Sequence, residues 1–322
     1  MFYYITRYIF KKAFSVFYQK VTVIGKENVL ANTPIILAIN HPNSFMDAMI
    51  VAVNLDEPVN SLTRGDAFKN KIAAGILRAS HMIPVYRLSE GIENVSKNLE
   101  TFQVCQSIFN ANGTVLIFVE GLCINNWKLR PLKKGVMRLA QQAWQYENTM
   151  HTVVIPVGLT YQHYKGAGKS MIINFGSPLS RNDFIEILDQ PNFSSQFNRQ
   201  LRSSLEELIF TDDELVDGSI RQQKFITNWN NLEKKYNGVE LLSKIKQGFN
   251  EKEIKPTKKF IPSAIHASII LIPHYWICSF LTGKFTKGTV HYDSVLFGLL
   301  VFLLPFYVLI LIGIYFLIRH FV

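Results

Sequence analysis

The sequence has few cysteines, and their positions form no recognisable pattern. Its 322 residues include Cys105, Cys123 and Cys278, an odd number without the spacing of metal ligands. A disulfide framework is therefore not expected, and a reducing compartment is the simpler interpretation. The first residues also lack the uninterrupted apolar core and the small-residue cleavage site of a secretory signal peptide.

Motifs of several hydrolase and nucleotide-binding classes are missing as well. The chain contains no G-x-S-x-G nucleophile motif and no H-E-x-x-H zinc motif. The stretch from Gly168 to Ser170, GKS, resembles the end of a P-loop, but His163 stands where that motif needs its first glycine. These absences argue against a serine nucleophile, a catalytic zinc ion and a P-loop nucleotide site.

Acidic residues are outnumbered, and charge is missing from one long stretch near the end. The chain has 34 Lys and Arg against 24 Asp and Glu, and it is rich in Phe (24) and Tyr (13). This basic and aromatic composition favours an anionic membrane surface over nucleic acid as a partner. Residues 295–318 carry no charge and are long enough to cross a bilayer as one helix.

A second uncharged segment, residues 261–281, precedes that run but is less apolar. We expect a C-terminal membrane hairpin, either as two spans or as one span and one interfacial helix, joined by residues 282–294. Lysines before the first segment and Arg319 after the second would place the main domain and the C-terminus in the cytosol. A helical hairpin buried in a soluble core is the alternative, and it is disfavoured because long charge-free runs are rare in soluble domains.

Residues 1–20 have the pattern of an amphipathic helix. A polar line at helical spacing contains Tyr4, Arg7, Lys11 and Ser15. Apolar side chains line another side, at Phe2, Ile5, Ile9, Ala13 and Phe17. A basic helix rich in aromatics suits a bilayer interface, and packing of this helix on the main domain is an equally weighted alternative.

Strand-like and helical patterns alternate through the middle of the chain. Apolar strand-like runs occur at 21–25, 34–39, 59–63, 82–86, 114–119, 153–161 and 170–176. Helical patterns lie between most of them, near 44–54, 66–79, 91–111 and 135–147. Such alternation predicts an α/β fold with a mostly parallel sheet flanked by helices, and the last two runs predict an antiparallel hairpin. The expected units are an interface helix, an α/β domain, a polar helical connector and the membrane hairpin, at 1–20, 21–210, 211–258 and 259–322.

Polar residues follow the predicted strands, at the edge where open α/β sheets bind ligands. His41 follows the second run, Arg64 the third, Arg87 the fourth, and Glu120 and Gly121 the fifth. A histidine with a carboxylate partner can act as a general base, and arginines can hold a phosphate. The residues therefore predict base-catalysed transfer onto a hydroxyl of a phosphorylated acceptor derived from the membrane.

Four blocks in this part of the chain resemble the motifs of the glycerolipid acyltransferases, the lysophosphatidate and glycerol-3-phosphate acyltransferase superfamily. The first motif is similar to NHPNSFMD at 40–47, and the second to MIPVYR at 82–87. The third resembles FVEG at 118–121 followed by LRPLKKG at 129–135, and the fourth VIPVGLTY at 154–161. The four blocks occur in the family's order.

The resemblance implies an integral or tightly bound membrane enzyme with its catalytic domain on the cytosolic face. His41 would take a proton from the acceptor hydroxyl while Asp47 orients the imidazole. The hydroxyl oxygen would then attack an acyl thioester of CoA or acyl-carrier protein, without an acyl-enzyme and without a cofactor. Arg87 would hold the acceptor's phosphate, and Glu120 and Gly121 would shape its pocket. Further contacts to the phosphate or the carrier would come from Arg64, Arg130, Lys133 and Lys134.

Two departures from the family pattern bear on the acceptor. Five residues separate His41 from Asp47, where the common pattern has four, and fungal-type glycerol-3-phosphate and dihydroxyacetone-phosphate acyltransferases share the longer spacing. Positions six apart diverge by about 120° on a regular helix, so His41 has to precede the helix that holds Asp47. In the third motif Val119, Leu122 and Cys123 replace the usual Pro, Thr and Arg, which leaves the phosphate contact open.

Several alternatives stay open at this stage. Ser44-x-x-Asp47 also fits a capping box at a helix start, and the basic residues at 130–134 also fit a surface beside anionic lipid. The leading acceptor is 1-acylglycerol-3-phosphate, followed by glycerol-3-phosphate, dihydroxyacetone phosphate and a lyso-aminolipid. A lipid hydrolase that uses His41 to activate water and an inactive membrane adaptor are the alternatives from other functional classes.

Overall fold

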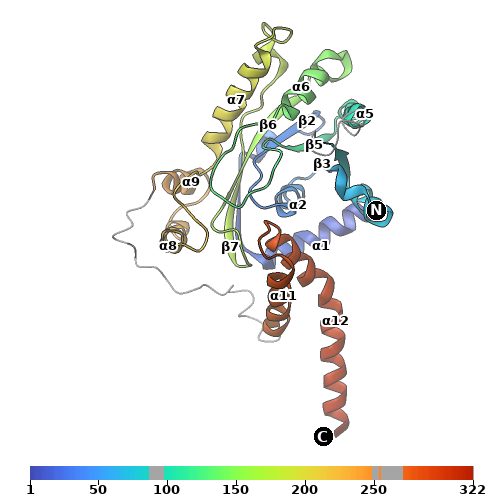
Figure 1. The fold of residues 1–322 in the computed structure, drawn as a ribbon, viewed down its shortest axis with the longest axis vertical. Coiled ribbons are helices and arrows are strands. Elements are labelled where there is room, and N and C mark those ends of the chain that lie inside the picture. Colours follow the sequence, from blue (N-terminus) through green and yellow to red (C-terminus); the bar gives the residue numbers. More distant parts are fainter. Residues whose placement is uncertain (87–97, 249–253, 255–270, 322) are drawn as a thin grey trace.

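The sheet has the predicted mostly parallel arrangement. The computed structural model describes residues 1–86, 98–248, 254 and 271–321. Within these residues seven strands form one sheet in the order β1-β7-β6-β2-β5-β3-β4 (Figure 1). All neighbouring strands pair in parallel except β6 and β7, which form the predicted antiparallel hairpin. The strands are β1 (Tyr18–Ile24), β2 (Ile35–Ile39), β3 (Val59–Arg64), β4 (Met82–Val85), β5 (Thr114–Phe118), β6 (Val153–Tyr161) and β7 (Lys169–Phe175).

Helices cover both faces of the sheet and bury two separate apolar cores. One core involves α1 (Phe2–Phe17), α2 (Phe45–Asn54), α8 (Ile220–Glu233), α9 (Gly238–Lys246), α11 (Ile272–Phe285) and α12 (Tyr292–Phe321). The other involves α5 (Asn98–Asn110), α6 (Gly135–Gln145) and α7 (Phe193–Leu208), while α3 (Lys71–Ala79) connects β3 to β4.

Strand β2 shows why the central part of the sequence is so apolar. Ile35, Leu37 and Ile39 point into the first core, whereas Ile36 and Ala38 point into the second. Successive side chains of a strand point to opposite faces, so a strand covered on both sides needs apolar residues at every position. All five residues of β2 are buried, and β2 is the fourth of the seven strands. The residues that follow its carboxyl end therefore lie in the middle of the sheet edge.

The C-terminal helices differ from a hairpin with two spans. Helix α11 has 14 residues and a length of about 21 Å, which is shorter than the hydrocarbon core of a bilayer. Among the described residues, one helix is long and apolar enough to cross a membrane: Tyr292–His320, with a mean hydropathy of 3.0. The first part of the predicted segment 261–281 lies outside the described residues. The described residues therefore contain one candidate span.

The residues that join α11 to α12 lie against the α/β domain. Helix α12 begins beside the sheet and then extends away from the rest of the molecule (Figure 1). A single crossing by α12 would put the C-terminus on the opposite side of the membrane from the domain, contrary to the cytosolic C-terminus expected from the charges. The residues at this junction are held by specific contacts with the domain.

Helix α1 packs on the domain through a face that differs from the predicted one. Tyr3, Phe14 and Phe17 are buried, and Phe14 stacks on Phe297 of α12 with ring centroids 4.4 Å apart. The predicted apolar side contributes only Phe17 and the partly buried Ala13, while the residues Phe2, Ile5 and Ile9 are exposed. Aromatic and aliphatic residues occur almost all around this helix, so periodicity alone did not reveal the packed face. The exposed apolar side chains suit a bilayer interface.

We predict that Phe297→Ala loosens α1 from the domain. The Phe297 ring is buried and contacts the rings of three α1 residues, Phe10, Phe14 and Phe17. Removing such a ring costs about 3–5 kcal/mol, so hydrogen exchange of α1 should accelerate and the thermal midpoint in detergent should fall. Phe302→Ala makes the same change at a position of α12 that is 66% exposed and should alter neither. Equal exchange in the two variants would contradict the prediction.

Candidate active site

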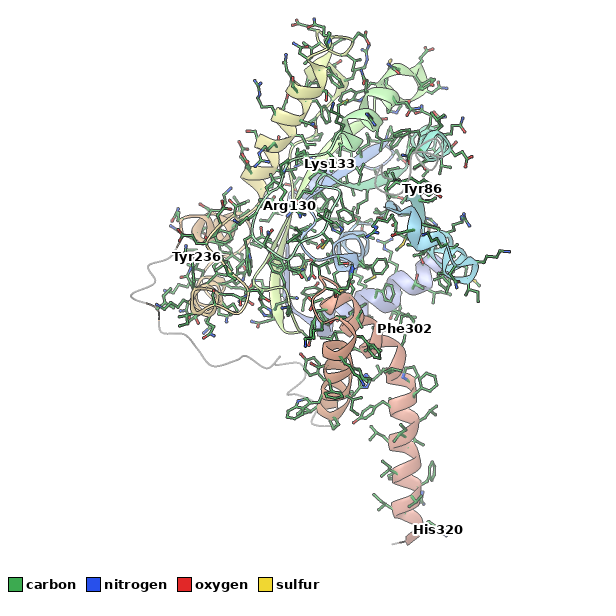
Figure 2. All side chains as sticks on the ribbon, in the orientation of Figure 1. Tyr86, Arg130, Lys133, Tyr236, Phe302 and His320 are labelled. Atoms are coloured by element: carbon green, nitrogen blue, oxygen red, sulfur yellow. The ribbon has the colours of Figure 1, made fainter. Side chains whose placement is uncertain are left out.

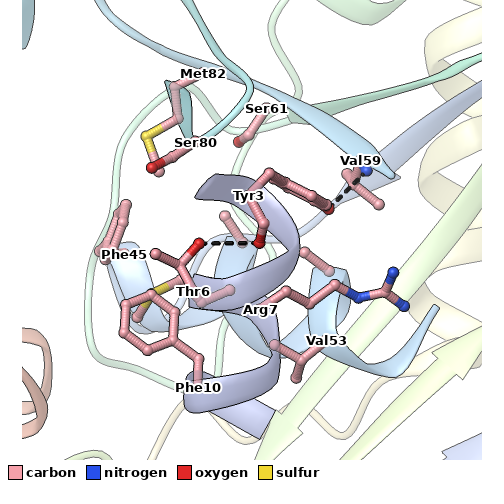
Figure 3. Close-up of a pocket in the computed structure, with 13 residues that line it drawn as sticks. Tyr3, Thr6, Arg7, Phe10, Phe45, Val53, Val59, Ser61, Ser80 and Met82 are labelled. Carbon is pink, nitrogen blue, oxygen red and sulfur yellow. Dashed lines mark hydrogen bonds between the residues drawn. The ribbon is translucent and has the colours of Figure 1, made fainter. Parts of the chain in front are cut away.

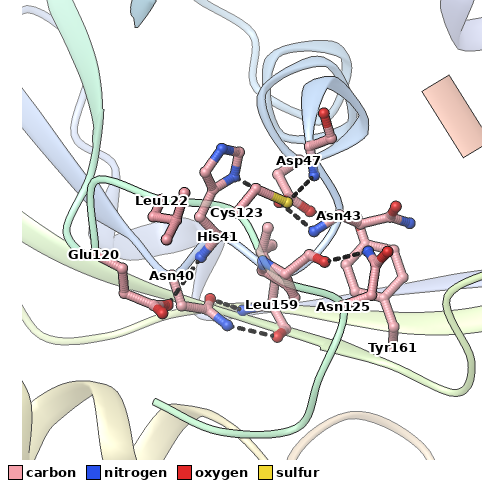
Figure 4. A network of polar contacts seen from close by, with 12 residues as sticks. Asn40, His41, Asn43, Asp47, Glu120, Leu122, Cys123, Asn125, Leu159 and Tyr161 are labelled. Carbon is pink, nitrogen blue, oxygen red and sulfur yellow. Dashed lines mark hydrogen bonds and ion pairs between the residues drawn. The ribbon is translucent and has the colours of Figure 1, made fainter. Parts of the chain in front are cut away.

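The site begins at Asn40, which extends the sheet beyond the end of β2. Its side-chain amide donates to the carbonyl of Leu159 at 3.0 Å and accepts from the Leu159 N–H at 2.7 Å (Figure 4). A side chain thus replaces the backbone pairing between β2 and β6 where β2 leaves the sheet. Because Asn40 is buried and doubly bonded, the position from which His41 projects is fixed.

His41 and Asp47 form a close pair. His41 Nδ1 lies 2.9 Å from Asp47 Oδ2, and the two side chains are 15% and 0% exposed. Asp47 occupies the first turn of α2, while His41 precedes the helix, as the six-residue separation predicted. The Asp47 carboxylate also accepts from the Asn43 N–H at 2.7 Å and from the Tyr161 hydroxyl at 2.8 Å. Three donors therefore compensate a carboxylate that has no contact with water.

These contacts assign the two nitrogens of the His41 ring. A carboxylate only accepts hydrogen bonds, so in the neutral ring Nδ1 carries the proton and Nε2 has the lone pair. The ring stacks on Phe118 with centroids 3.6 Å apart and an interplanar angle of 14°, which fixes its plane. Nε2 has no hydrogen-bond partner in the described part of the chain. Its lone pair is available to take a proton from a molecule outside the protein.

Tyr161 is a member of the site that sequence reasoning missed. Burial, together with the nearby Asp47 charge, raises the pKa of its hydroxyl well above the usual range. The hydroxyl therefore stays protonated and keeps donating to Asp47. The only available signal was its position at the carboxyl end of the strand that carries the fourth motif.

Ser44 does not form the capping box that its spacing to Asp47 suggested. It precedes α2 with a φ of +53° and makes no side-chain capping bond. Its N–H donates to Cys123 Sγ at 2.9 Å, and its hydroxyl lies 2.6 Å from His291 Nδ1. The Asp47 side chain bonds to Asn43 instead of to Ser44. The role of Asp47 beside His41 therefore does not compete with capping.

Glu120 holds the backbone of His41. Its Oε1 accepts from the His41 N–H at 3.1 Å, and its Oε2 accepts from Arg130 Nε at 2.7 Å. Arg130 also donates to the carbonyl of Leu122. The buried Glu120 thus joins the end of β5 to the turn that holds His41, and Arg130 neutralises its charge.

Gly121 and Lys133 meet where the chain turns after Glu120. Gly121 has a φ of +63°, and a Cβ there would lie 3.1 Å from Lys133 Cγ. The Lys133 N–H donates to the carbonyl of Val119 at 2.7 Å, so the two segments of the third motif lie side by side. The side chains of Lys133 (labelled in Figure 2) and Lys134 are exposed.

Arg64 lies apart from this network. Its side chain is exposed and forms an ion pair with Asp66, two residues further along the chain. Arg87 lies outside the described residues. The structure thus brings together His41, Asp47, Glu120, Gly121, Arg130 and Lys133.

An apolar groove lies between α1 and α2, the helix that carries Asp47 (Figure 3). Its cavity volume is about 70 Å³, and its apolar lining includes Tyr3, Phe10, Phe45, Met49, Val53 and Val59. Arg7 stands at the groove and donates to the carbonyl of Asp56 at 2.8 Å. The groove is thus a largely apolar surface on the helix that carries Asp47.

A comparison with protein families covers most of the residues of this site. Residues 20–160 match the family model described as Acyltransferase. These residues form an acyltransferase-family domain. The matched range contains His41, Asp47, Glu120 and Arg130, whereas Tyr161 lies one residue beyond it.

Two individual proteins are similar to the chain. It is 27% identical over 138 residues to glycerol-3-phosphate O-acyltransferase 2 of Saccharomyces cerevisiae, a match that covers 43% of this chain and 18% of that protein. The chain therefore spans less than a fifth of the length of that relative. A solved structure, the 1-acyl-sn-glycerophosphate acyltransferase PlsC of Thermotoga maritima, has a TM-score of 0.44 and 18% identity over 63% of this chain and 78% of its own.

We predict that Cys123 does not react as a thiolate. Burial, followed by the neighbouring Asp47 charge, raises the pKa of its thiol to about 12. At pH 8 the thiolate fraction is then about 10³-fold smaller than that of an unperturbed cysteine. Alkylation of Cys123 by iodoacetamide should therefore be slow in the folded protein and fast after denaturation, as measured by peptide mass spectrometry. Rapid labelling of folded Cys123 at pH 8 would overturn this prediction.

Proposed function

We propose that the chain is an O-acyltransferase that moves a fatty acyl group from an acyl thioester to a hydroxyl of a phosphorylated glycerol. The donor is acyl-CoA or acyl-carrier protein, and the acceptor is 1-acylglycerol-3-phosphate or glycerol-3-phosphate. One observation carries the proposal: an acyltransferase-family domain holds a His41–Asp47 pair with the Nε2 lone pair open. A lone pair held in that way is what general-base activation of a hydroxyl requires.

The proposed reaction needs one base and no covalent enzyme intermediate. His41 Nε2 takes the proton from the acceptor hydroxyl as its oxygen attacks the thioester carbonyl carbon. The carbon–sulfur bond of the resulting tetrahedral intermediate then breaks, and the thiolate leaves. The thiolate then accepts this proton from His41, which regenerates the neutral imidazole and releases a free thiol and an ester.

Asp47 serves this reaction by fixing the ring and stabilising its charged form. Its 2.9 Å contact with Nδ1 keeps Nε2 as the basic nitrogen, and it becomes an ion pair when the ring is protonated. Because Asp47 is fully buried and anchored by Asn43 and Tyr161, it moves little between the two states. Little structural reorganisation is therefore needed when the His41 ring changes from its neutral to its charged form.

The acceptor phosphate is assigned to Arg130 and Lys133. Arg130 uses its Nε on Glu120 and one N–H on Leu122, which leaves donors for a ligand. Lys133 is exposed beside Gly121 and adds a second cation. The relative from Saccharomyces cerevisiae is by name a glycerol-3-phosphate acyltransferase, which supports a phosphorylated glycerol as the acceptor. Arg87 and Lys134 remain proposed contacts, while Arg64, paired with Asp66, is not assigned one.

The acyl chain of the donor is proposed to lie in the apolar groove between α1 and α2. Phe45 and Met49 line that groove from the same helix that presents Asp47 to His41. A chain in the groove would place its carboxyl end near the first turn of α2. This arrangement supports a donor with a long apolar chain.

We predict that His41→Ala reduces acyl transfer by about 10²- to 10⁴-fold, since that is the usual contribution of a general base. The measurement is transfer of labelled acyl groups by purified protein to a panel of phosphorylated and unphosphorylated glycerol acceptors. His151→Ala, the same change at an exposed histidine outside the site, is the control and should retain full activity. Full activity of His41→Ala would refute the mechanism, and release of free fatty acid without transfer would identify a hydrolase.

We also propose that α12 crosses the membrane and that the acyltransferase domain lies on the cytosolic face. Phe302, labelled in Figure 2, is an exposed apolar side chain on the part of α12 that projects from the domain. Phe306, one turn further along α12, is exposed as well. The predicted consequence is that Lys287 and Arg319 lie on opposite sides of the bilayer. Lys287→Cys should react with an impermeant maleimide from the domain side of sealed vesicles, and Arg319→Cys only after permeabilisation. Labelling of both from one side would contradict a single crossing.

A further inference from the structure

Two polar contacts connect the turn between His41 and Asp47 to the start of α12. Asn43 Nδ2 donates to Asp293 Oδ2 at 2.9 Å, and the Ser44 hydroxyl lies 2.6 Å from His291 Nδ1. Asn43 and Ser44 both lie between His41 and Asp47 in the sequence. The turn that presents the base is therefore in direct contact with residues about 250 positions away: Asp293 in the first turn of α12 and His291 just before that helix.

Asp293 is itself firmly anchored in the α/β domain. Its side chain is fully buried and forms an ion pair with Lys169 at the start of β7, which is also fully buried. The Gly166 N–H donates to Asp293 Oδ1 at 2.8 Å, and Lys169 Nζ donates to the carbonyl of Tyr164 at 2.9 Å. The carboxylate therefore has partners from the β6–β7 hairpin as well as from the catalytic turn.

Asn43 links the two buried carboxylates. Its backbone N–H donates to Asp47 Oδ2 at 2.7 Å, while its side-chain amide donates to Asp293. Its Oδ1 is buried and has no hydrogen-bond partner among the described residues. Asp293 is thus the only described hydrogen-bond partner of this side chain, and it fixes how the backbone of Asn43 faces Asp47.

We propose that the start of α12 positions the catalytic base, with Asp293 acting through Asn43 and His291 through Ser44. Asp293 and His291 are positioning residues, because neither contacts His41. The kinetic part of this inference rests on the acyl-transfer function proposed above.

The backbone of the turn explains why it needs support. Ser44 has a φ of +53°, a conformation that is costly for a residue with a Cβ and persists only where its surroundings enforce it. The turn is also one residue longer than the common family spacing. The contacts of Asn43 and Ser44 with α12, together with the Cys123 contact of the Ser44 N–H, hold this longer turn in place.

A role in anchoring alone makes a different prediction from a role in positioning. If Asp293 only attached α12 to the domain, any replacement that keeps the protein folded would leave the rate of transfer unchanged. If Asp293 positions the turn, a folded variant that cannot accept from Asn43 would lower kcat with little change in KM. Two double variants separate these cases without leaving Lys169 as an unpaired buried charge, which would be strongly destabilising.

The test compares Lys169→Met/Asp293→Leu with Lys169→Met/Asp293→Asn in the full chain in detergent micelles. Both remove the ion pair, and apolar replacement of buried ion pairs is often neutral for stability. Only the asparagine variant keeps an oxygen that can accept from Asn43. We expect kcat to fall about 10- to 100-fold in the leucine variant, as a misplacement of about 1 Å can cause. The asparagine variant should stay within about threefold of wild type.

A second measurement does not depend on catalysis. The Nδ1–H of His41 bonded to Asp47 should give a downfield proton NMR signal, assigned by its loss in His41→Ala. It should persist in the asparagine variant and weaken or vanish in the leucine variant. If the wild-type protein shows the signal but transfers no acyl group, the proposed function fails, while the comparison of signals still decides the inference about α12.

Ser294→Ala is the matched control. Its hydroxyl is buried beside Asp293 and has no hydrogen-bond partner in the described part of the chain, so its removal should change neither kcat nor the signal. Wild-type kcat and an unchanged signal in the leucine variant would overturn the inference. Equal losses in the two double variants would also overturn it, because the effect would then come from the ion pair and not from the contact with Asn43.

Discussion

The buried carboxylate of Asp47 is the constraint on which the rest of the site depends. A carboxylate with no exposed surface is tolerated only when donors surround it. Here the donors come from the turn after β2, from the end of β6 and from the imidazole that it orients. The sheet order places β2 beside β6, so the two strand ends that supply these groups are neighbours. Folding and chemistry therefore impose the same requirement on this part of the sequence.

Glu120 is a second buried carboxylate with compensating partners, and it lies just after the neighbouring strand β5. It is buried, it receives the His41 N–H, and Arg130 compensates its charge. His41 is thus held by one carboxylate through its ring and by another through its backbone. This double attachment leaves the Nε2 side of the ring as its open edge, and the acyltransferase domain presents that edge at the carboxyl ends of β2 and β5.

Local patterns were enough to predict the strands, the β6–β7 hairpin and the placement of His41 before the helix of Asp47. Each of these depends on residues close together in sequence, where side-chain periodicity and helix geometry apply. The contacts with Tyr161, Lys169 and Asp293 were not predictable in this way, because their partners are 114 to 250 positions apart. The packed face of α1 was also missed, since it is selected by Phe297 of a distant helix and not by its own pattern.

The buried pair of Lys169 and Asp293 has a practical consequence for preparing a soluble form. Ending the chain before α12 would remove its long apolar segment, but it would also remove the counter-charge of the fully buried Lys169. It would leave Asn43 without an acceptor and would uncover the core positions now filled by Leu296 and Phe297. A truncated protein would therefore lose part of its interior along with its anchor. Solubilisation is better sought by polar substitutions on the distal, exposed turns of α12, beyond Phe302.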